Sequence, residues 1–122
     1  MKLVKLKNVP NKNEIISWLI KLLKESESNY SPLIEENNYP NKEFFILING
    51  DKIIPAYIEC KKDEALVLWV HESCRKQGYA KFMINKMGIK YAIAAPDSIQ
   101  FWKTMGFNQI SSSSGPAIMK RI

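Results

Sequence analysis

Arg75-Lys76-Gln77-Gly78-Tyr79-Ala80 is the stretch on which the fold prediction rests. It follows an apolar run, Leu66-Val67-Leu68-Trp69-Val70, and precedes a helix-like segment, Lys81 to Met87, so a strand is predicted to enter a helix through a short basic loop. The first amides of such a helix have no partner and carry the positive end of the helix dipole, which favours a phosphate. Gly78 would allow close approach of the backbone, and the two basic residues that open the stretch would add mobile positive charge. The alternative is a glycine that only turns the chain.

Two motifs in the second half of the chain resemble one known family. The segment Val70-His71-Glu72-Ser73-Cys74-Arg75-Lys76-Gln77-Gly78-Tyr79-Ala80 resembles the acyl-CoA pyrophosphate loop of the GCN5-related N-acetyltransferases, whose pattern is Arg or Gln, two residues, Gly, one residue, then Gly or Ala. Further along, Asp97-Ser98-Ile99-Gln100-Phe101-Trp102-Lys103-Thr104-Met105-Gly106-Phe107 resembles the later helix of that family, which ends in an aromatic pair followed by Gly-Phe. The resemblance covers residues 44–122, with a strand-like segment between the two motifs.

Length and composition describe an ordinary globular protein. With 122 residues the chain can form its own core, and we expect a single domain over residues 1–122. Hydrophobic residues make up 46% and charged residues 25%, and no apolar run approaches the length that spans a bilayer. Cys60 and Cys74 do not make a disulfide framework, and with a single histidine they do not make a zinc site. We therefore expect a cytoplasmic protein without a metal.

The formal net charge of +6 indicates the kind of partner but does not select one. It suits an anionic ligand such as coenzyme A, an acidic partner or nucleic acid. The lysines are scattered through the first two thirds of the chain instead of forming a tract, which favours a solvated face.

The N-terminal third contains a strand pattern and a helix pattern. Met1 to Lys7 alternates charged and apolar residues and is predicted to be the first strand. Asn11 and Glu14 have the spacing of a capping box at the start of a helix. Apolar residues then repeat at helical spacing: Ile15, Ile16, Leu19, Leu22 and Leu23. Glu25 to Lys42 is polar and is predicted to be a loop, in the region that lines the acceptor site of the resembling family.

The middle of the chain predicts three successive antiparallel strands. Residues 44–48 and 52–60 flank Asn49-Gly50, a dipeptide that tolerates the positive φ angles of a tight turn. Pro55 has no amide proton, so a bulge or an unpaired position is predicted there. A charged turn then leads into the strand from Glu64 to Val70.

After the basic loop and its helix, strands and helices alternate. Ile89 to Ala95 reads as a strand, Pro96 as the start of a helix that Gly106 closes, and Ala117 to Arg121 as the last strand. Ser111 to Ser114 is predicted to be a flexible run.

This order of elements predicts an α/β or α+β domain with helices on both faces of the sheet. The resemblance implies the acyl-CoA N-acyltransferase fold, with a mixed, mostly antiparallel central sheet of about seven strands. In that fold the sheet is splayed between the strand that ends at Val70 and the strand that ends at Ala95. The pantetheine arm of the coenzyme would enter the splay and pair with the backbone there.

The resemblance also implies a coenzyme site. Acetyl-CoA is expected as the cosubstrate, with no metal ion. The residues carried over as coenzyme-binding are Leu68, Val70, Arg75, Lys76, Gln77, Gly78, Tyr79, Ala80, Lys81, Ala95, Phe101 and Trp102.

Two residues are candidates for the base that takes the proton of an amine acceptor. Glu64 starts the strand that leads into the loop, which resembles the placement of the general-base glutamate in histone-type members of the family. The alternative is that Glu64 only begins a strand after a charged turn. His71 is the second candidate, because imidazole titrates near neutral pH, although it follows the strand closely and could simply face solvent.

The sequence departs from the family pattern at Trp102 and Ala95. Many members carry a tyrosine at the first position, where it donates to the coenzyme sulfur, and an indole cannot protonate a thiolate. Either the thiolate leaves without a protein acid, or the domain binds the coenzyme and catalyses poorly. Asparagine is common at the position of Ala95, so one hydrogen bond to the coenzyme is in question.

The leading functional prediction is an N-acetyltransferase that moves an acetyl group from acetyl-CoA directly to a primary amine. The acceptor would be a small molecule or a peptide, or a charged tRNA as in the toxin branch of the family. Two alternatives remain open: a coenzyme-binding module with little catalysis, and a basic nucleic-acid-associated domain that the charge, together with exposed aromatic residues, would favour. No membrane partner is expected, and a homodimer is compatible with the resemblance.

Overall fold

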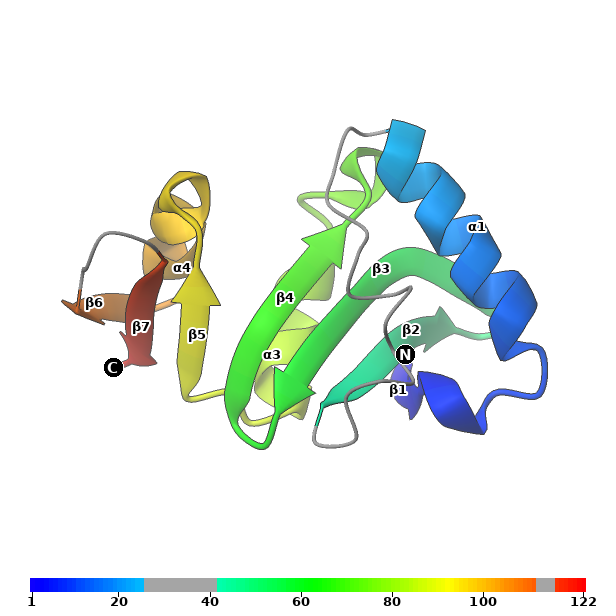
Figure 1. Ribbon diagram of the computed structural model, residues 1–122, viewed down its shortest axis with the longest axis horizontal. Helices are drawn as coiled ribbons and strands as arrows, with labels where there is room; N and C mark the ends of the chain where they lie inside the picture. Colours follow the sequence, from blue (N-terminus) through cyan, green and yellow to red (C-terminus); the bar gives the residue numbers. More distant parts are fainter. Residues whose placement is uncertain (26–41, 112–115) are drawn as a thin grey trace.

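The computed structural model describes residues 1–25, 42–111 and 116–122. These residues form one seven-stranded sheet in the order β1-β2-β3-β4-β5-β7-β6 (Figure 1). The strands are β1 (Lys2–Lys5), β2 (Glu43–Asn49), β3 (Lys52–Lys61), β4 (Glu64–Val70), β5 (Tyr91–Ala94), β6 (Phe107–Ser111) and β7 (Ala117–Arg121). The helices are α1 (Lys12–Glu25), α3 (Tyr79–Lys86) and α4 (Ile99–Thr104), with short 3-10 segments η1 (Leu6–Asn8), η3 (Glu72–Cys74) and η4 (Pro96–Ser98). No helix in these ranges is long and apolar enough to cross a membrane.

The sheet is mixed and splayed, as the resemblance implies. Neighbouring strands pair antiparallel except β4 and β5, which run parallel. Those two strands pair through Glu64 with Tyr91 and through Ala65 with Ala92, and then separate towards their C-terminal ends (Figure 1). The predicted fold, with its opening between these two strands, is confirmed.

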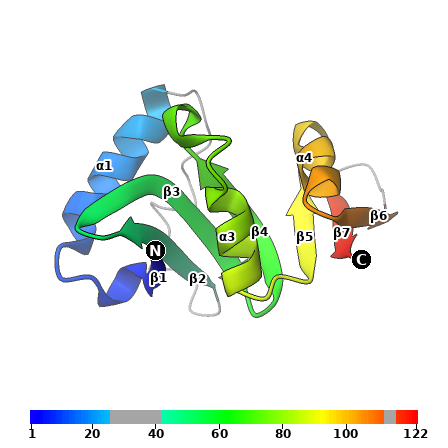
Figure 2. The ribbon, with the colours of Figure 1, turned by 180° about the vertical axis from the view of Figure 1, so that it is seen from behind.

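Side-chain alternation divides the core between the two faces of the sheet. On one face α1 packs through Ile15, Leu19 and Leu23 against a cluster that includes Tyr57 and Trp69. On the other face α3 and α4 cover a second cluster of buried side chains. Figure 1 shows α1 in front of the sheet, and Figure 2, seen from behind, shows α3 in front of it. Helices therefore cover both faces, as predicted.

The β2–β3 hairpin forms as predicted but turns one residue later. Asn49 pairs with Lys52, so the turn lies at Gly50 and Asp51 instead of Asn49-Gly50. Gly50 has a φ of +65°, a conformation that glycine adopts without steric cost. The register of this pair also shifts at the position of Pro55, as expected from a residue without an amide proton.

One strand, β6, has no counterpart among the strands read from the residues. Phe107 is its one buried side chain and the rest are exposed, so it lacks the regular alternation of a half-buried strand. It pairs with β7 at the edge of the sheet, and tertiary pairing therefore decides its conformation. The loop predicted from Glu25 to Lys42 and the run from Ser111 to Ser114 lie largely outside the described residues.

Cys60 provides a test of the core. Its side chain is 1% exposed, and burial, followed by the charges of Glu43 and Glu59, raises the pKa of its thiol to about 11. The unfolded thiol ionises from about pH 9, so the folded state keeps a proton that the unfolded state has lost. We expect this thiol to lower the free energy of unfolding by about 2 kcal/mol as pH rises from about 9 to about 11.

Urea unfolding at several pH values in this range would measure the loss. Cys60→Ala should be less stable at neutral pH because it leaves a cavity, but its stability should fall less steeply with pH. An identical slope for the two proteins would contradict the prediction.

Candidate functional site

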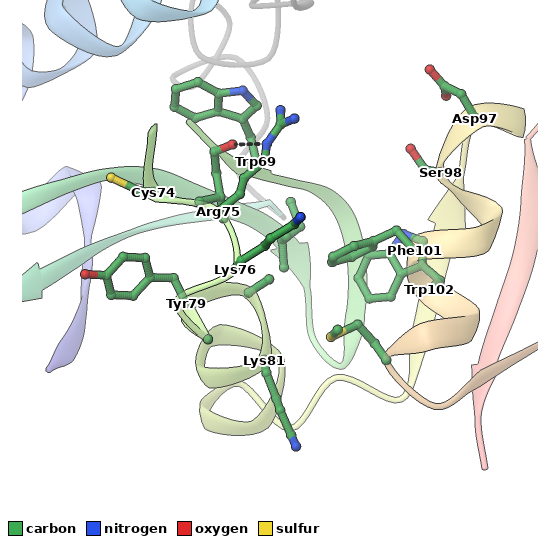
Figure 3. A pocket seen from close by; sticks show the side chains of 15 residues that line it. Trp69, Cys74, Arg75, Lys76, Tyr79, Lys81, Asp97, Ser98, Phe101 and Trp102 are labelled. Carbon is green, nitrogen blue, oxygen red and sulfur yellow. Dashed lines mark hydrogen bonds between the residues drawn. The ribbon is translucent and has the colours of Figure 1, made fainter. Parts of the chain in front are cut away.

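A cavity of about 730 Å³ opens where β4 and β5 have separated. One wall consists of the end of β4, the loop that follows it and the start of α3. The facing wall consists of η4 and α4 (Figure 3). The residues that line the cavity thus come from two segments that lie on opposite sides of the splay.

The N-terminus of α3 opens on this cavity. Its first intrahelical hydrogen bond runs from the Phe82 N–H to the Gly78 carbonyl at 3.0 Å, so the amides before Phe82 have no partner within the helix. Gly78 and Lys76 adopt left-handed conformations, with φ of +83° and +65°. Left-handed residues that alternate with ordinary ones turn successive backbone N–H groups towards one concave side. Such a concave group of N–H donors can bind an anion. The geometry therefore supports a phosphate site at the mouth of the cavity.

One basic side chain of the loop contacts the backbone of β4. The Arg75 Nε donates a hydrogen bond to the Val70 carbonyl at 3.0 Å, which ties the loop to the end of β4. Figure 3 shows the guanidinium beside Trp69 at the rim of the cavity. Mobile charge was expected at both Arg75 and Lys76, and in the structure Arg75 makes this backbone contact. Lys76 and Lys81 add positive charge to the same rim.

The α4 part of the facing wall is apolar, whereas η4 adds Asp97 and Ser98 to it. Trp102 is 4% exposed, and its ring lies edge-on to Phe101 at 5.3 Å and to Phe107 at 5.0 Å between centroids. Such aromatic pairs prefer this edge-to-face geometry, which holds the indole in place. Trp102 therefore serves as part of the wall of the cavity as well as of the core.

Solved structures share this architecture, although no protein-family model and no curated protein sequence matches the chain. Tetrahymena GCN5 is 16% identical, with a TM-score of 0.67 over 99% of this chain and 95% of that one. An acetyltransferase from Thermus thermophilus is 15% identical, with a TM-score of 0.72 over 99% and 97% of the two chains. The Campylobacter jejuni N-acetyltransferase PseH, in complex with acetyl coenzyme A, is 12% identical, with a TM-score of 0.65 over 97% and 95%.

The chain has the GCN5-related N-acetyltransferase fold. In this acetyltransferase fold the cavity lies at the splay, between the basic loop and α4. Most of the residues predicted to bind the coenzyme line it. They are Leu68, Val70, Arg75, Lys76, Gly78, Tyr79, Ala80, Lys81, Phe101 and Trp102. Gln77 and Ala95 are exposed and lie outside the lining.

The two base candidates also lie outside the lining. Glu64 is half-buried at the closed end of the splay, where it pairs with Tyr91. Because β4 has seven residues, the loop is about 20 Å from that end.

His71 lies at the other end of β4, and its hydrogen bonds limit it as a base. Its Nδ1 accepts the Ser73 N–H at 3.2 Å and lies 2.7 Å from the Ser73 hydroxyl. A neutral ring with Nδ1 as the acceptor carries its proton on Nε2, and that nitrogen then donates. The ring also packs edge-on against Trp69 at 5.9 Å.

Several lining residues were not predicted. These are Trp69, Cys74, Asp97, Ser98 and Met105. Asp97 and Ser98 belong to the second motif, but a motif within one segment does not indicate that η4 faces the loop across the splay. Within residues 1–25, 42–111 and 116–122, no group of His, Cys, Asp and Glu side chains is placed to hold a metal.

From the geometry of the loop we predict that Gly78 is essential for binding phosphate. A Cβ at Gly78 would meet no atom within 4 Å, but a glutamate would put negative charge beside the free amides. We expect Gly78→Glu to weaken the binding of coenzyme A by about a hundredfold or more, the effect of losing roughly 3 kcal/mol of anion binding. Titration calorimetry would measure the affinity, and circular dichroism would check the fold.

Gly88→Glu is the matched control for backbone strain. Gly88 also has a positive φ, +62°, and a Cβ added there would meet no atom within 4 Å, but it lies at the other end of α3, outside the cavity. This variant should bind coenzyme A like the unmodified protein. Equal affinity of all three proteins would exclude the loop as the phosphate site.

Proposed function

We propose that this protein is a GCN5-related N-acetyltransferase that transfers an acetyl group directly from acetyl-CoA to a primary amine. The main observation behind the proposal is the basic loop, whose backbone N–H groups face the mouth of the cavity between the separated strands β4 and β5. Two neighbours of the same fold support it, since the Campylobacter jejuni PseH structure holds acetyl coenzyme A and an aminoglycoside 6'-N-acetyltransferase structure holds coenzyme A.

The residues of the cavity suit the coenzyme in charge and polarity, with three basic side chains against the one carboxylate of Asp97 among its described lining residues. The free amides at Gly78 and the lysines at positions 76 and 81 would hold the phosphates. Beyond Ala65 the described part of β5 provides no partner for β4, so β4 offers unpaired backbone groups along the cavity to a pantetheine arm. Leu68, Phe101 and Trp102 supply apolar walls. When bound, acetyl-CoA would supply an acetyl group activated as a thioester.

The contribution of the protein to the rate would be mainly positional. Holding the thioester against the amine can supply roughly 7–11 kcal/mol by removing the entropy of a bimolecular encounter. We propose that Glu64, at the closed end of the splay, receives the amine proton through water. His71 is the less favoured base, because its acceptor nitrogen already accepts the Ser73 amide.

We propose a primary amine of a small molecule or peptide as the acceptor. A neighbour of the same fold is a spermidine N-acetyltransferase from Vibrio cholerae, 13% identical with a TM-score of 0.64. Residues 26–41, which would border the acceptor by resemblance, lie outside the described residues. The free thiols of Cys60 and Cys74 fit a reducing compartment, and we propose the cytoplasm.

A coenzyme-binding module with little catalysis is the second candidate. It is favoured by Trp102, a packed indole at the sequence position where many members of the resembling family carry a tyrosine that donates to the sulfur. The two candidates differ in turnover and not in affinity for the coenzyme.

Calorimetric titration with acetyl-CoA, followed by a free-thiol assay against a panel of amines, separates the two. We expect micromolar affinity and release of the coenzyme A thiol with at least one amine. Binding without thiol release would favour the binding module. Absence of binding would reject both.

Glu64→Gln tests the proposed base. Because a positioned base contributes about a hundredfold or more, we expect kcat to fall by about that factor while the KM for acetyl-CoA changes little. Asp63→Asn is the matched control, since it removes the neighbouring carboxylate in the turn before β4. A loss in His71→Ala with full activity in Glu64→Gln would assign the base to His71 instead.

A further inference from the structure

The described residues of the cavity leave the departing sulfur with few candidate donors. The indole N–H of Trp102 can donate a hydrogen bond but cannot supply a proton, and the ring is packed against Phe101 and Phe107. The hydroxyl groups among the described lining residues belong to Tyr79 and Ser98. In Figure 3 the phenol of Tyr79 points away from α4, whereas Ser98 stands on the wall that carries Trp102.

Ser98 lies one helical turn before Trp102. It is the last residue of η4, which continues directly into α4, and residues four apart lie on the same side of a helix. Both side chains line the cavity, and Ser98 is half-buried. Its hydroxyl is therefore on the same side of this wall as the indole that replaces the usual tyrosine.

The Ser98 hydroxyl is not used by the helix that it precedes. A serine before a helix usually adopts an extended backbone and accepts an amide of the first turn. Here Ser98 has helical φ and ψ of −102° and −7°, and it makes no side-chain cap hydrogen bond. Its own N–H donates to the Ala95 carbonyl at 2.8 Å, which fixes the backbone at this corner. The hydroxyl is therefore available to donate a hydrogen bond to a ligand in the cavity.

We propose that Ser98 donates a hydrogen bond to the coenzyme sulfur as the acetyl group is transferred. This inference rests on the proposed function. In the reaction the bond between the amine nitrogen and the acetyl carbon forms, the bond between that carbon and sulfur breaks, and the bonding electron pair goes to sulfur. The Ser98 hydroxyl stabilises the resulting negative charge, the base takes the amine proton, and solvent supplies the proton that completes the thiol.

A hydrogen bond of this kind has a signature that does not require turnover. A donor to a thiolate favours the charged form and lowers the pKa of the thiol. The probe is coenzyme A itself, bound to the protein and titrated through the ultraviolet absorbance of its thiolate. We expect Ser98→Ala to raise the pKa of the bound thiol by about one to two units, and to lower kcat by about tenfold to a hundredfold without changing the KM for acetyl-CoA.

Two variants complete the test. Ser98→Thr keeps a hydroxyl and should retain the pKa of the bound thiol. Thr104→Ala removes a hydroxyl from the same helix, but Thr104 bonds the Gln100 carbonyl at 3.0 Å and lies outside the cavity, so neither readout should change.

The outcomes distinguish a failure of the Ser98 contact from a failure of the proposed acetyltransferase function. A raised thiol pKa in Ser98→Ala supports the contact even if no amine is acetylated, in which case only the transferase proposal fails. Normal turnover with the same thiol pKa in Ser98→Ala and the unmodified protein overturns the contact and leaves the transferase intact. Failure of the unmodified protein to bind coenzyme A overturns both.

Discussion

The short parallel contact between β4 and β5 is the constraint on which the rest of the structure depends. Ala65 and Ala92 form one of its pairs, and both are fully buried and small enough for close approach. Beyond this contact each strand is packed against a different helix, with α3 on β4 and α4 on β5 and β7. The two halves of the sheet are therefore joined at one end and open at the other, and the cavity occupies the opening.

Contacts within the protein support both walls of this opening. The Arg75 side chain fastens the loop to the Val70 carbonyl, so the N-terminus of α3 has a fixed relation to β4. On the facing wall, the contact of Trp102 with Phe107 of β6 contributes about 0.5–1.5 kcal/mol beyond burial and helps to hold α4 against the sheet. A site whose catalysis is proposed to come from positioning depends on such rigid walls, because misplaced reactants lose the entropic advantage.

Sequence patterns predicted the parts of the site that are contiguous in the chain. The basic loop and the aromatic helix each carry their residues within a single segment, and most of those residues line the cavity. Ser98 and Met105 were missed because a helix pattern does not show which of its sides faces another segment. β6 was missed because its exposed side chains carry little signal, whereas pairing with β7 stabilises it.

The sequence by itself determined the local conformations and their order. Pro55 predicts an irregular strand pair and Asn49-Gly50 predicts a tight turn, because each effect depends on the residue and its immediate neighbours. Only the tertiary structure decided that β4 and β5 part after Ala65, that Arg75 binds Val70 and that Ser98 lies across from the loop. These outcomes depend on side chains from distant segments competing for the same space, and no local pattern encodes that competition.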